Sequence, residues 1–313
     1  MSEGNHLKPP KSYFIEITNH CNLRCSMCNF HSPVVPEKRR KGFMDKDLAK
    51  EILKEIAGFG ENAWVALHGA GEPLLHKELI EIIEFAQGFE NINCGFLTNG
   101  VILDKDKTER LISAGISWIG FSLDGIVKEK FEKYRVGSNY EEIMKNVLYF
   151  LERNSITGKK VHTLVNMTVQ EEMKEDVEAF IDYWLDSVDE VAISPYRPIG
   201  SRHNILVDSS EPRQPCYMLY EMMVIFWDGE VGLCCEDWFN FGKMGNVNHE
   251  RMIDIWNGKG FKDARLRHER GLFNEIDLCK DCNSWFRKTI EEKDEKRGCL
   301  VQRNAWQYVY RRN

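Results

Sequence analysis

Residues 13–194 alternate between short apolar segments and amphipathic segments, and this alternation constrains the fold more than any other feature. It is typical of parallel strands joined by right-handed crossover helices. Because eight repeats would close a full TIM barrel, six strand segments predict an α/β fold with a partial, open (βα)6 barrel. The expected strands are residues 13–18, 63–68, 92–99, 117–124, 161–169 and 190–194. The expected helices are residues 44–57, 76–87, 106–115 and 171–185, with helical stretches up to Arg153.

The alternation stops at residues 198–215, a connector rich in proline and serine. Residues 222–237 then predict a β-hairpin that turns at Asp228 and Gly229, because an Asp-Gly pair suits a tight turn. Two short helical segments follow. The charged tail from Arg287 onward predicts a helix that ends the chain.

Composition narrows the class of protein. A chain of 313 residues with a hydrophobic fraction of 42% can form one barrel with an appended domain. Its first residues lack the apolar segment of a signal peptide, and no segment is apolar for long enough to cross a membrane. We therefore expect a cytoplasmic protein whose ten cysteines are thiols, metal ligands or catalytic groups. The net charge of −7 gives no reason to expect nucleic acid as a partner.

One basic run, residues 37–41 (EKRRK), stands apart from this acidic background. It can be read as a solvated loop. A second interpretation is a docking site for an acidic electron donor, because the run lies close to a group of cysteines in the sequence.

Three cysteines, Cys21, Cys25 and Cys28, lie on one short segment directly after the first expected strand. Barrel enzymes place their chemistry at that end of the strands. The spacing C-x3-C-x2-C lets one tight loop direct three thiolates at a single point. Three thiolates suit a four-iron cluster that keeps one iron open for another ligand.

Two other interpretations of this segment are available. The three cysteines share one helical face, so they could be buried apolar residues, but polar neighbours such as Asn19, His20 and Asn22 argue against a packed helix. Zinc is the other alternative. Three ligands without a fourth nearby would leave a structural zinc site incomplete.

The segment resembles the radical S-adenosylmethionine (SAM) superfamily, whose hallmark is C-x3-C-x2-C after the first strand of a partial barrel. The resemblance runs from residue 12 to about residue 200 and implies that Cys21, Cys25 and Cys28 hold a [4Fe–4S] cluster. The fourth iron would chelate the amino and carboxylate groups of SAM, and one electron would split the sulfonium to give a 5′-deoxyadenosyl radical. Met27, at a position that is often aromatic in the superfamily, would lie near the adenine.

Further motifs agree with this resemblance. The run GAGEP, residues 69–73, corresponds to a glycine-rich element of the superfamily that ends the second strand. Gly71 would let the backbone approach the ligand, and Glu72 would accept a hydrogen bond from its ammonium group. Taken alone, the run could also be an ordinary glycine turn.

Polar residues also end later strands, and by resemblance they would line the space for SAM or substrate, although each could instead cap a helix or form a turn. These residues are Asn99, Ser122, Asp124 and Asn166. Arg197, after the sixth strand, is a candidate partner for a substrate carboxylate, or a surface salt bridge.

A second group of cysteines lies on three segments of the remaining chain, and on its own it suits zinc as readily as iron and sulfur. The group is Cys216, Cys234, Cys279 and Cys282. Its spacing, with the runs GEVGLC and DIWNGKGFKDAR, resembles the SPASM/twitch extension of radical SAM enzymes. The resemblance implies residues 1–200 as the barrel and residues 201–313 as a twitch-like domain with one auxiliary [4Fe–4S] cluster.

Three cysteines remain outside both groups. Cys235 is either a small buried residue or a thiol that returns a hydrogen atom to a substrate radical, as in some radical SAM epimerases. Cys94 lies inside the third strand and is expected in the core. Cys299 has no assignment.

A fully ligated auxiliary cluster would serve to move electrons, so the resemblance implies a dehydrogenase of a small polar substrate such as a sugar or aminocyclitol. The run GEPLL is similar to that of twitch dehydrogenases that oxidise an aminocyclitol alcohol. The cluster would take electrons from a flavodoxin- or ferredoxin-like donor. The catalytic candidates are then Cys235, Asp124 and Arg197. Alternatives are redox-neutral epimerisation, a peptide maturase, and a non-catalytic metal scaffold.

Overall fold

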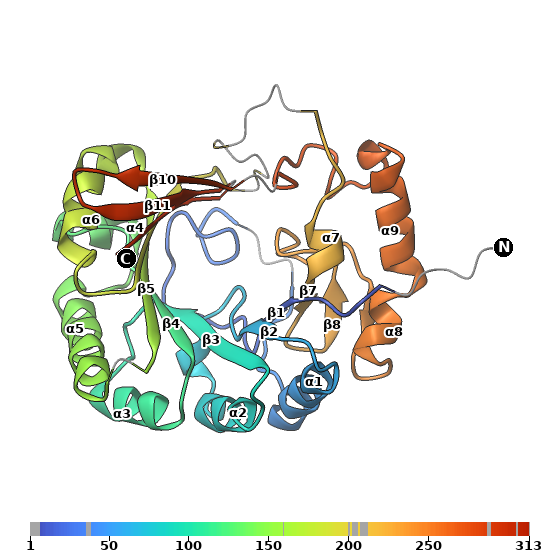
Figure 1. The fold of residues 1–313 in the computed structure, drawn as a ribbon, viewed down its shortest axis with the longest axis horizontal. Coiled ribbons are helices and arrows are strands. Elements are labelled where there is room, and N and C mark those ends of the chain that lie inside the picture. The colour runs from blue at the N-terminus through green and yellow to red at the C-terminus, as the bar shows by residue number, and fades with distance from the viewer. Residues whose placement is uncertain are drawn as a thin grey trace.

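The computed structural model describes residues 7–35, 39–158, 160–199, 201, 206, 212–286, 289–304 and 306–312. The strands of this described part form one 12-stranded sheet, in the order β10-β11-β12-β6-β5-β4-β3-β2-β1-β7-β8-β9. Figure 1 shows the sheet as an open arc that curves around a central space. The carboxyl ends of the parallel strands therefore meet at one edge of a partial barrel.

The six expected barrel strands are present and pair in parallel with their neighbours. They are β1 (Ser12–Ile15), β2 (Ala63–Ala66), β3 (Ile92–Thr98), β4 (Trp118–Ser122), β5 (His162–Val169) and β6 (Glu190–Pro195). Each pair of successive strands is joined by at least one helix, which matches the predicted alternation. The prediction of a partial (βα)6 barrel is thus confirmed.

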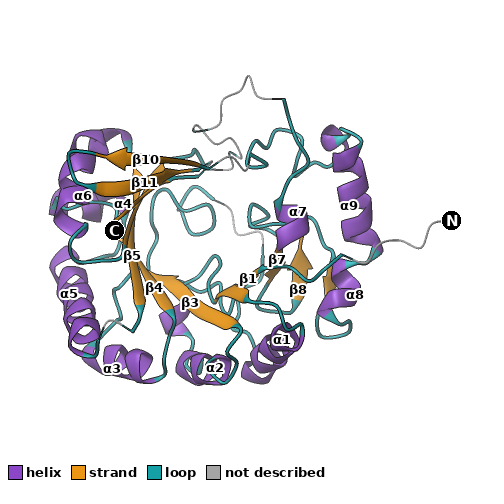
Figure 2. Ribbon diagram, in the orientation of Figure 1, coloured by secondary structure: helices purple, strands orange, loops and turns teal. Residues whose placement is uncertain are grey.

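The connecting helices lie on the outer side of the arc (Figures 1 and 2). They are α1 (Lys46–Gly58), α2 (Leu79–Ala86), α3 (Lys105–Ser113), α4 (Lys128–Tyr134), α5 (Tyr140–Ile156) and α6 (Val177–Trp184). The segment before α6 differs from its prediction, because residues 171–176 form a 3-10 helix. No helix in the described part of the chain is both long and apolar enough to cross a membrane.

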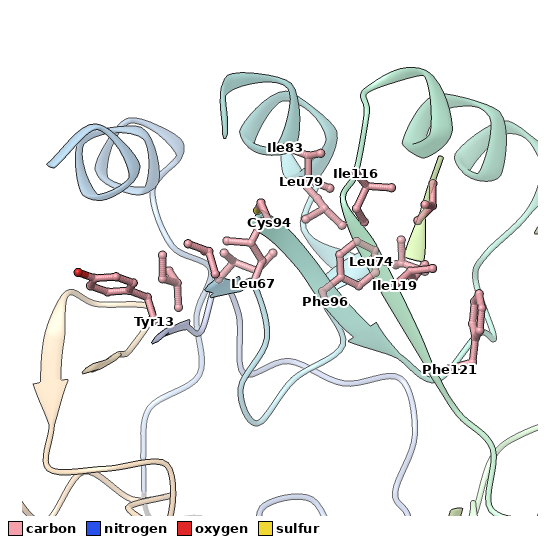
Figure 3. Close-up of a cluster of buried hydrophobic side chains, with 14 of the residues drawn as sticks. Tyr13, Leu67, Leu74, Leu79, Ile83, Cys94, Phe96, Ile116, Ile119 and Phe121 are labelled. Atoms are coloured by element: carbon pink, nitrogen blue, oxygen red, sulfur yellow. The ribbon is translucent and has the colours of Figure 1, made fainter. Parts of the chain in front are cut away.

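Local sequence explains these elements. The carboxylate of Asp45 caps α1 by accepting hydrogen bonds from the backbone N–H groups of Asp47 and Leu48. The apolar side of that helix packs on the sheet. Figure 3 shows Cys94 of β3 beside Leu79 of α2, in the layer between sheet and helices. The Cys94 side chain is fully buried there, as the sequence predicts.

The chain after residue 212 extends the same sheet beyond β1. β7 (Met222–Ile225) pairs in parallel with β1, and β8 (Glu230–Gly232) and β9 (Gly245–Asn246) continue as antiparallel strands. The predicted hairpin turn is present, and Gly229 has a positive φ of 81°. The helical elements of this region are α7 (Met218–Glu221), α8 (Met252–Trp256) and α9 (Lys259–Glu269). Most of the connector 198–215 lies outside the described residues.

The predicted terminal helix is wrong, because the tail forms three antiparallel strands. These are β10 (Ile290–Asp294), β11 (Cys299–Arg303) and β12 (Tyr308–Arg311), and β12 pairs with β6 at the open edge of the barrel. β10 consists mainly of exposed charged residues, and a run of charged residues in a sequence can equally be the solvent-facing side of a helix. Cys299, the first residue of β11, has a fully buried side chain.

Candidate functional site

The first cysteines lie on a loop that leaves β1 and is closed at its neck. Thr18 and Phe43 form an isolated β-bridge. Within it, the buried Asn19 side chain donates to the Arg40 carbonyl at 2.9 Å and accepts from the Gly42 N–H at 2.9 Å. The loop therefore has a fixed base, and Figure 1 shows it inside the arc of the sheet.

The three loop thiols lie close enough to influence one another. Burial is the main cause that raises the pKa of Cys21 to about 12, and the nearby Glu72, Cys25 and Cys28 contribute to this rise. Backbone donors reach another thiol of the loop. The Sγ atom of Cys28 accepts from the backbone N–H groups of Phe30 at 3.4 Å and His31 at 3.2 Å. Such N–H···S contacts stabilise thiolates that bind a cluster.

Among the residues that the structure describes, no three Cys, His, Asp or Glu side chains are grouped so as to hold a single metal ion. A four-iron cluster does not require such a group, because each thiolate binds a different iron atom. Bound iron also deprotonates a coordinating thiol, whatever the thiol's pKa in its absence. The donor set of the loop thus fits a four-iron cluster better than zinc.

Gly71 packs closely against the cysteine loop. A Cβ atom at this position would lie 2.4 Å from the Thr18 carbonyl oxygen and 2.5 Å from that of His20. Its missing side chain therefore makes room for the neck of the cysteine loop, and the predicted close approach to a bound ligand stays a prediction. The neighbouring Glu72 N–H donates to the His20 carbonyl at 2.8 Å and completes this contact.

Replacing Gly71 with alanine should therefore disturb the loop. We expect the free energy of unfolding to fall by ~1–3 kcal/mol, the usual cost of overpacking, and the iron content to fall with it. Calorimetry and iron analysis would measure both. Gly58→Ala is the matched control, because a Cβ atom on that exposed helical glycine meets nothing within 4 Å. A Gly71→Ala protein as stable and as iron-rich as the control would contradict the assignment.

Glu72 has protein donors in this structure. Its buried carboxylate accepts from the Thr98 hydroxyl at 2.8 Å and the Asn99 N–H at 2.8 Å, and it also caps the short helix at Leu74. The carboxylate thereby joins the ends of β2 and β3. A contact with the ammonium group of SAM stays a prediction.

Asn99 itself contacts the cysteine loop. Its side-chain amide donates to the Asn22 side-chain oxygen at 2.8 Å and lies 3.8 Å from the Sγ atom of Cys21. It thus supports a candidate cluster ligand, and the structure does not place it among the residues that line the chambers described below.

Asp124 is paired within the protein. Its side chain is completely buried, accepts from the Thr168 N–H at 2.8 Å and forms an ion pair with Arg135 at 2.7 Å. Burial raises the pKa of Cys25, and Arg135 opposes this rise. The ion pair therefore lies beside the cysteine loop, and a catalytic role for Asp124 stays a prediction.

A chamber lined mainly by apolar and aromatic side chains lies inside the arc and reaches the cysteine loop. We call this cavity of about 610 Å³ the main chamber. The predicted site residues on its wall are Met27, Cys28, Asn166, Arg197 and Cys235. Ser122 pairs with Asn166 in the sheet, but among the described residues it is not part of this wall.

A smaller cavity of about 180 Å³, which we call the side chamber, adjoins the main chamber. Six residues line both cavities: Phe14, His68, Arg197, Cys235, Trp238 and Trp306. Barrel strands, the second cysteine region and the C-terminal hairpin thus all contribute to one continuous site.

Arg197 forms part of the wall between these regions. Its guanidinium group makes a 2.8 Å ion pair with the buried Glu236 and lies 4.9 Å from the ring centre of Trp306. The Trp306 indole N–H donates to the Tyr217 hydroxyl at 3.3 Å. Arg197 is therefore neither a surface salt bridge nor an unpaired anion receptor.

The second group of cysteines surrounds a small cavity of its own, directly behind Cys235. Its lining includes Cys216, Cys234, Cys279 and Cys282. Burial raises the pKa of Cys216 to about 12, and Cys282 and Cys279 add to the rise. The Ser284 N–H lies 3.4 Å from the Sγ atom of Cys282 and donates to it. Four thiols around one space fit a fully ligated cluster.

The described part of the basic run is partly exposed to solvent. Arg39 forms a bidentate ion pair with Glu16, at 2.7 and 2.8 Å, and its guanidinium lies 4.3 Å from the ring centre of Phe226. Arg40 is exposed, and its guanidinium lies 4.9 Å from the ring centre of Trp227. The solvated-loop interpretation therefore does not hold for Arg39, docking of an electron donor stays a prediction, and residues 36–38 lie outside the described part.

Sequence reasoning missed several residues of the two chambers. The sequence predicts His68 only as the last residue of a strand. Trp238 and Trp306 lie in segments that lack the strand–helix alternation of the barrel. For His68 a signal existed, because it directly precedes the glycine-rich run that ends β2. For Trp306 no local signal existed, since its position depends on the pairing of β12 with β6.

Comparison with protein families agrees with this geometry. The model of the radical SAM superfamily matches residues 15–183, and that of the SPASM iron-sulfur cluster-binding domain matches residues 216–283. The two matches cover the barrel with its cysteine loop and the region with the second group of cysteines.

Curated relatives cover different shares of the chain. GTP 3',8-cyclase of Hydrogenovibrio crunogenus is 31% identical over 202 residues, which are 64% of this chain and 59% of the relative. The chain thus spans little more than half of that protein. The tungsten-containing aldehyde ferredoxin oxidoreductase cofactor-modifying protein of Pyrococcus furiosus is 26% identical over 87% of each chain.

Solved structures share the fold. BtrN in complex with AdoMet and 2-DOIA aligns over 88% of this chain and 94% of its own, with 21% identity and a TM-score of 0.58. Streptococcus suis SuiB bound to S-adenosylmethionine aligns over 89% of this chain and 73% of its own, with 16% identity and a TM-score of 0.68.

Proposed function

Because this chain belongs to the radical SAM superfamily and carries a SPASM domain, we propose that it dehydrogenates a small polar molecule by a radical mechanism. Enzymes with these two domains use [4Fe–4S] clusters and SAM. The substrate class that we propose is a sugar, an aminocyclitol or a similar polyol. The BtrN complex contains 2-DOIA, and its fold resembles this chain along almost its whole length.

We assign the two groups of cysteines to two clusters. Cys21, Cys25 and Cys28 would hold the cluster that binds SAM, because they share one loop and Cys28 lines the main chamber. The four cysteines behind Cys235 would hold an auxiliary cluster. Both assignments are supported by the chemistry of the donors, since thiolates are the usual ligands of such clusters.

One observation carries the proposal. The main chamber has Met27 and Cys28 of the loop on its wall together with Cys235, the direct neighbour of Cys234 in the second group. A substrate in this chamber would lie between the place where a radical is generated and a place that can accept an electron. Dehydrogenation requires both, because it removes two electrons and two protons from the substrate.

When bound, the loop cluster and SAM supply a 5′-deoxyadenosyl radical that abstracts a hydrogen atom. The protein's own residues hold the reactants and exclude water. The stacked rings of Trp64 and Trp118, 4.7 Å apart, form part of the chamber wall inside the barrel. The Asn166 side-chain oxygen is buried and has no hydrogen-bond partner in the described part of the chain, so it can accept from a ligand.

Epimerisation is the second candidate, and the position of Cys235 favours it. Its thiol lines both chambers and lies 3.7 Å from the sulfur of Met218, so it could donate a hydrogen atom to a substrate radical. In this case the substrate would return to its original oxidation state. In dehydrogenation the substrate radical loses an electron and a proton, whereas in epimerisation it receives a hydrogen atom.

Turnover in heavy water separates the two reactions. For dehydrogenation, we expect an oxidised product without solvent deuterium at carbon, formed by wild type and by Cys235→Ala. Mass spectrometry and NMR of the product would detect the label. Deuterium at a substrate carbon, absent with Cys235→Ala, would instead establish epimerisation. Cys299→Ala is the matched control, because that thiol is buried at the start of β11.

The electron donor remains part of the proposal. A flavodoxin- or ferredoxin-like protein would supply the electron for the loop cluster. Docking of this donor on residues 37–41 stays a prediction: of this run, Arg40 is exposed, whereas Arg39 is paired with Glu16.

A further inference from the structure

His68 lies where the two chambers meet, and neither family membership nor the proposed reaction assigns it a role. The residue follows β2 directly and lines both the main chamber and the side chamber. Its ring packs edge-to-face against Phe14, with ring centres 5.6 Å apart, and against Trp118 at 6.1 Å. Aromatic rings on two sides therefore hold the imidazole in one orientation.

The backbone determines which nitrogen of this ring carries the proton. Leu97 donates its N–H to the Nδ1 atom of His68 at 3.2 Å, so Nδ1 must be the unprotonated nitrogen. In a neutral imidazole the proton then sits on Nε2. Within the described part of the chain, the hydrogen bond from Leu97 is the one found at this ring, and it involves Nδ1 and leaves Nε2 without a protein partner.

The ring is neutral at physiological pH. Removal from bulk water lowers the pKa of His68 to about 4, because the charged imidazolium would lose its hydration. The ring is partly buried and lines both chambers. A neutral ring with this tautomer can donate one hydrogen bond into the chambers, but it cannot accept a proton at Nε2.

We propose that His68 orients the substrate by donating a hydrogen bond from Nε2 to a hydroxyl or carbonyl oxygen of a small ring bound where the main chamber meets the side chamber. This inference rests on the proposed function, because it assigns a residue to the substrate of that same site. The side chamber's volume of about 180 Å³ lies below the ~300–1,000 Å³ of sites for larger ligands, so it suits a single substituted ring.

A hydrogen-bond donor at this position can bind both the substrate and the product of the proposed reaction. A hydroxyl oxygen in the substrate and a carbonyl oxygen in the product can each accept the same hydrogen bond. The contact would keep the carbon that bears the oxygen in place while its hydrogen atom is removed. Cys235 and the Arg197–Glu236 ion pair lie on the wall of the same chamber.

Binding measurements on the iron-loaded protein with SAM, without reductant, test this inference. The probes are 2-DOIA, myo-inositol and cyclohexylamine, which has the ring but no oxygen. We expect at least one of the two oxygen-bearing rings to bind wild type. His68→Phe should weaken that binding about tenfold, as expected for one lost hydrogen bond. His68→Gln should restore most of it, because an amide can accept from Leu97 and still donate. Cyclohexylamine should not respond to either substitution.

His249→Phe, in an exposed loop, is the control and should bind as wild type does. Three results would overturn the inference: equal polyol binding by wild type and His68→Phe, equal losses for polyol and cyclohexylamine, or no binding of either polyol. The proposed function fails by a different measurement, namely the absence of an oxidised product under reducing conditions. The two failures can therefore be distinguished.

Discussion

Replacing Cys21, Cys25 or Cys28 with alanine will abolish the formation of 5′-deoxyadenosine from SAM. Each thiolate would bind a separate iron of the loop cluster, so the loss of one opens a second iron and destabilises the cluster. The neighbouring donors to Cys28, from Phe30 and His31, cannot replace a missing thiolate. Chromatography of anaerobic reactions with dithionite would measure the product, and iron analysis would show the loss of one cluster.

Cys94→Ala is the matched control for this prediction. That thiol is fully buried in the core between β3 and the outer helices, far from any assigned ligand set. Its loss should lower the free energy of unfolding slightly by leaving a small cavity, but it should leave SAM cleavage intact. Persistent 5′-deoxyadenosine formation in all three loop variants would mean that the cluster is held elsewhere.

The barrel could be predicted because its signals are local. The apolar strand segments, their polar ends and the glycine-rich turns lie within a few residues of one another, and α1 even carries its own Asp45 cap. The edges of the sheet could not be predicted in the same way. The pairing of β7 with β1 and of β12 with β6 joins segments that are more than a hundred residues apart.

The tail shows why such pairing is hidden in the sequence. β10 exposes most of its side chains to solvent, so its charged residues give no alternating pattern. Tyr308, Val309 and Tyr310 do favour a strand, because aromatic and β-branched side chains fit a sheet. Their partner, however, is β6, whose free edge becomes evident only in the assembled barrel.

At the site, residue types were easier to predict than residue roles. Glu72 and Asp124 were chosen as polar groups at strand ends, and both do lie there. Their carboxylates nevertheless bind protein donors, Asn99 and Thr98 in one case and Arg135 in the other. A sequence lists possible donors and acceptors, whereas only the three-dimensional arrangement shows which of them are already paired.

Replacing one cysteine ligand of the auxiliary cluster should abolish substrate oxidation but leave SAM cleavage intact. We expect wild type to hold about eight irons per chain, the sum of two four-iron clusters, and Cys279→Ala or Cys282→Ala to hold about four. Both variants should still cleave SAM, because the loop cysteines are untouched. Substrate oxidation should nevertheless fall to background, since the electron left on the substrate radical has lost its acceptor.

The control for these variants is Cys299→Ala, which removes a buried thiol that contributes to neither ligand set. It should keep about eight irons and full oxidation. Iron and sulfide analysis, with SAM cleavage and product formation measured in parallel, would separate the outcomes. Cys282→Ala protein that still oxidises substrate at the wild-type rate would exclude the second cluster as electron acceptor. Loss of both SAM cleavage and oxidation would instead point to a structural role of the second group of cysteines.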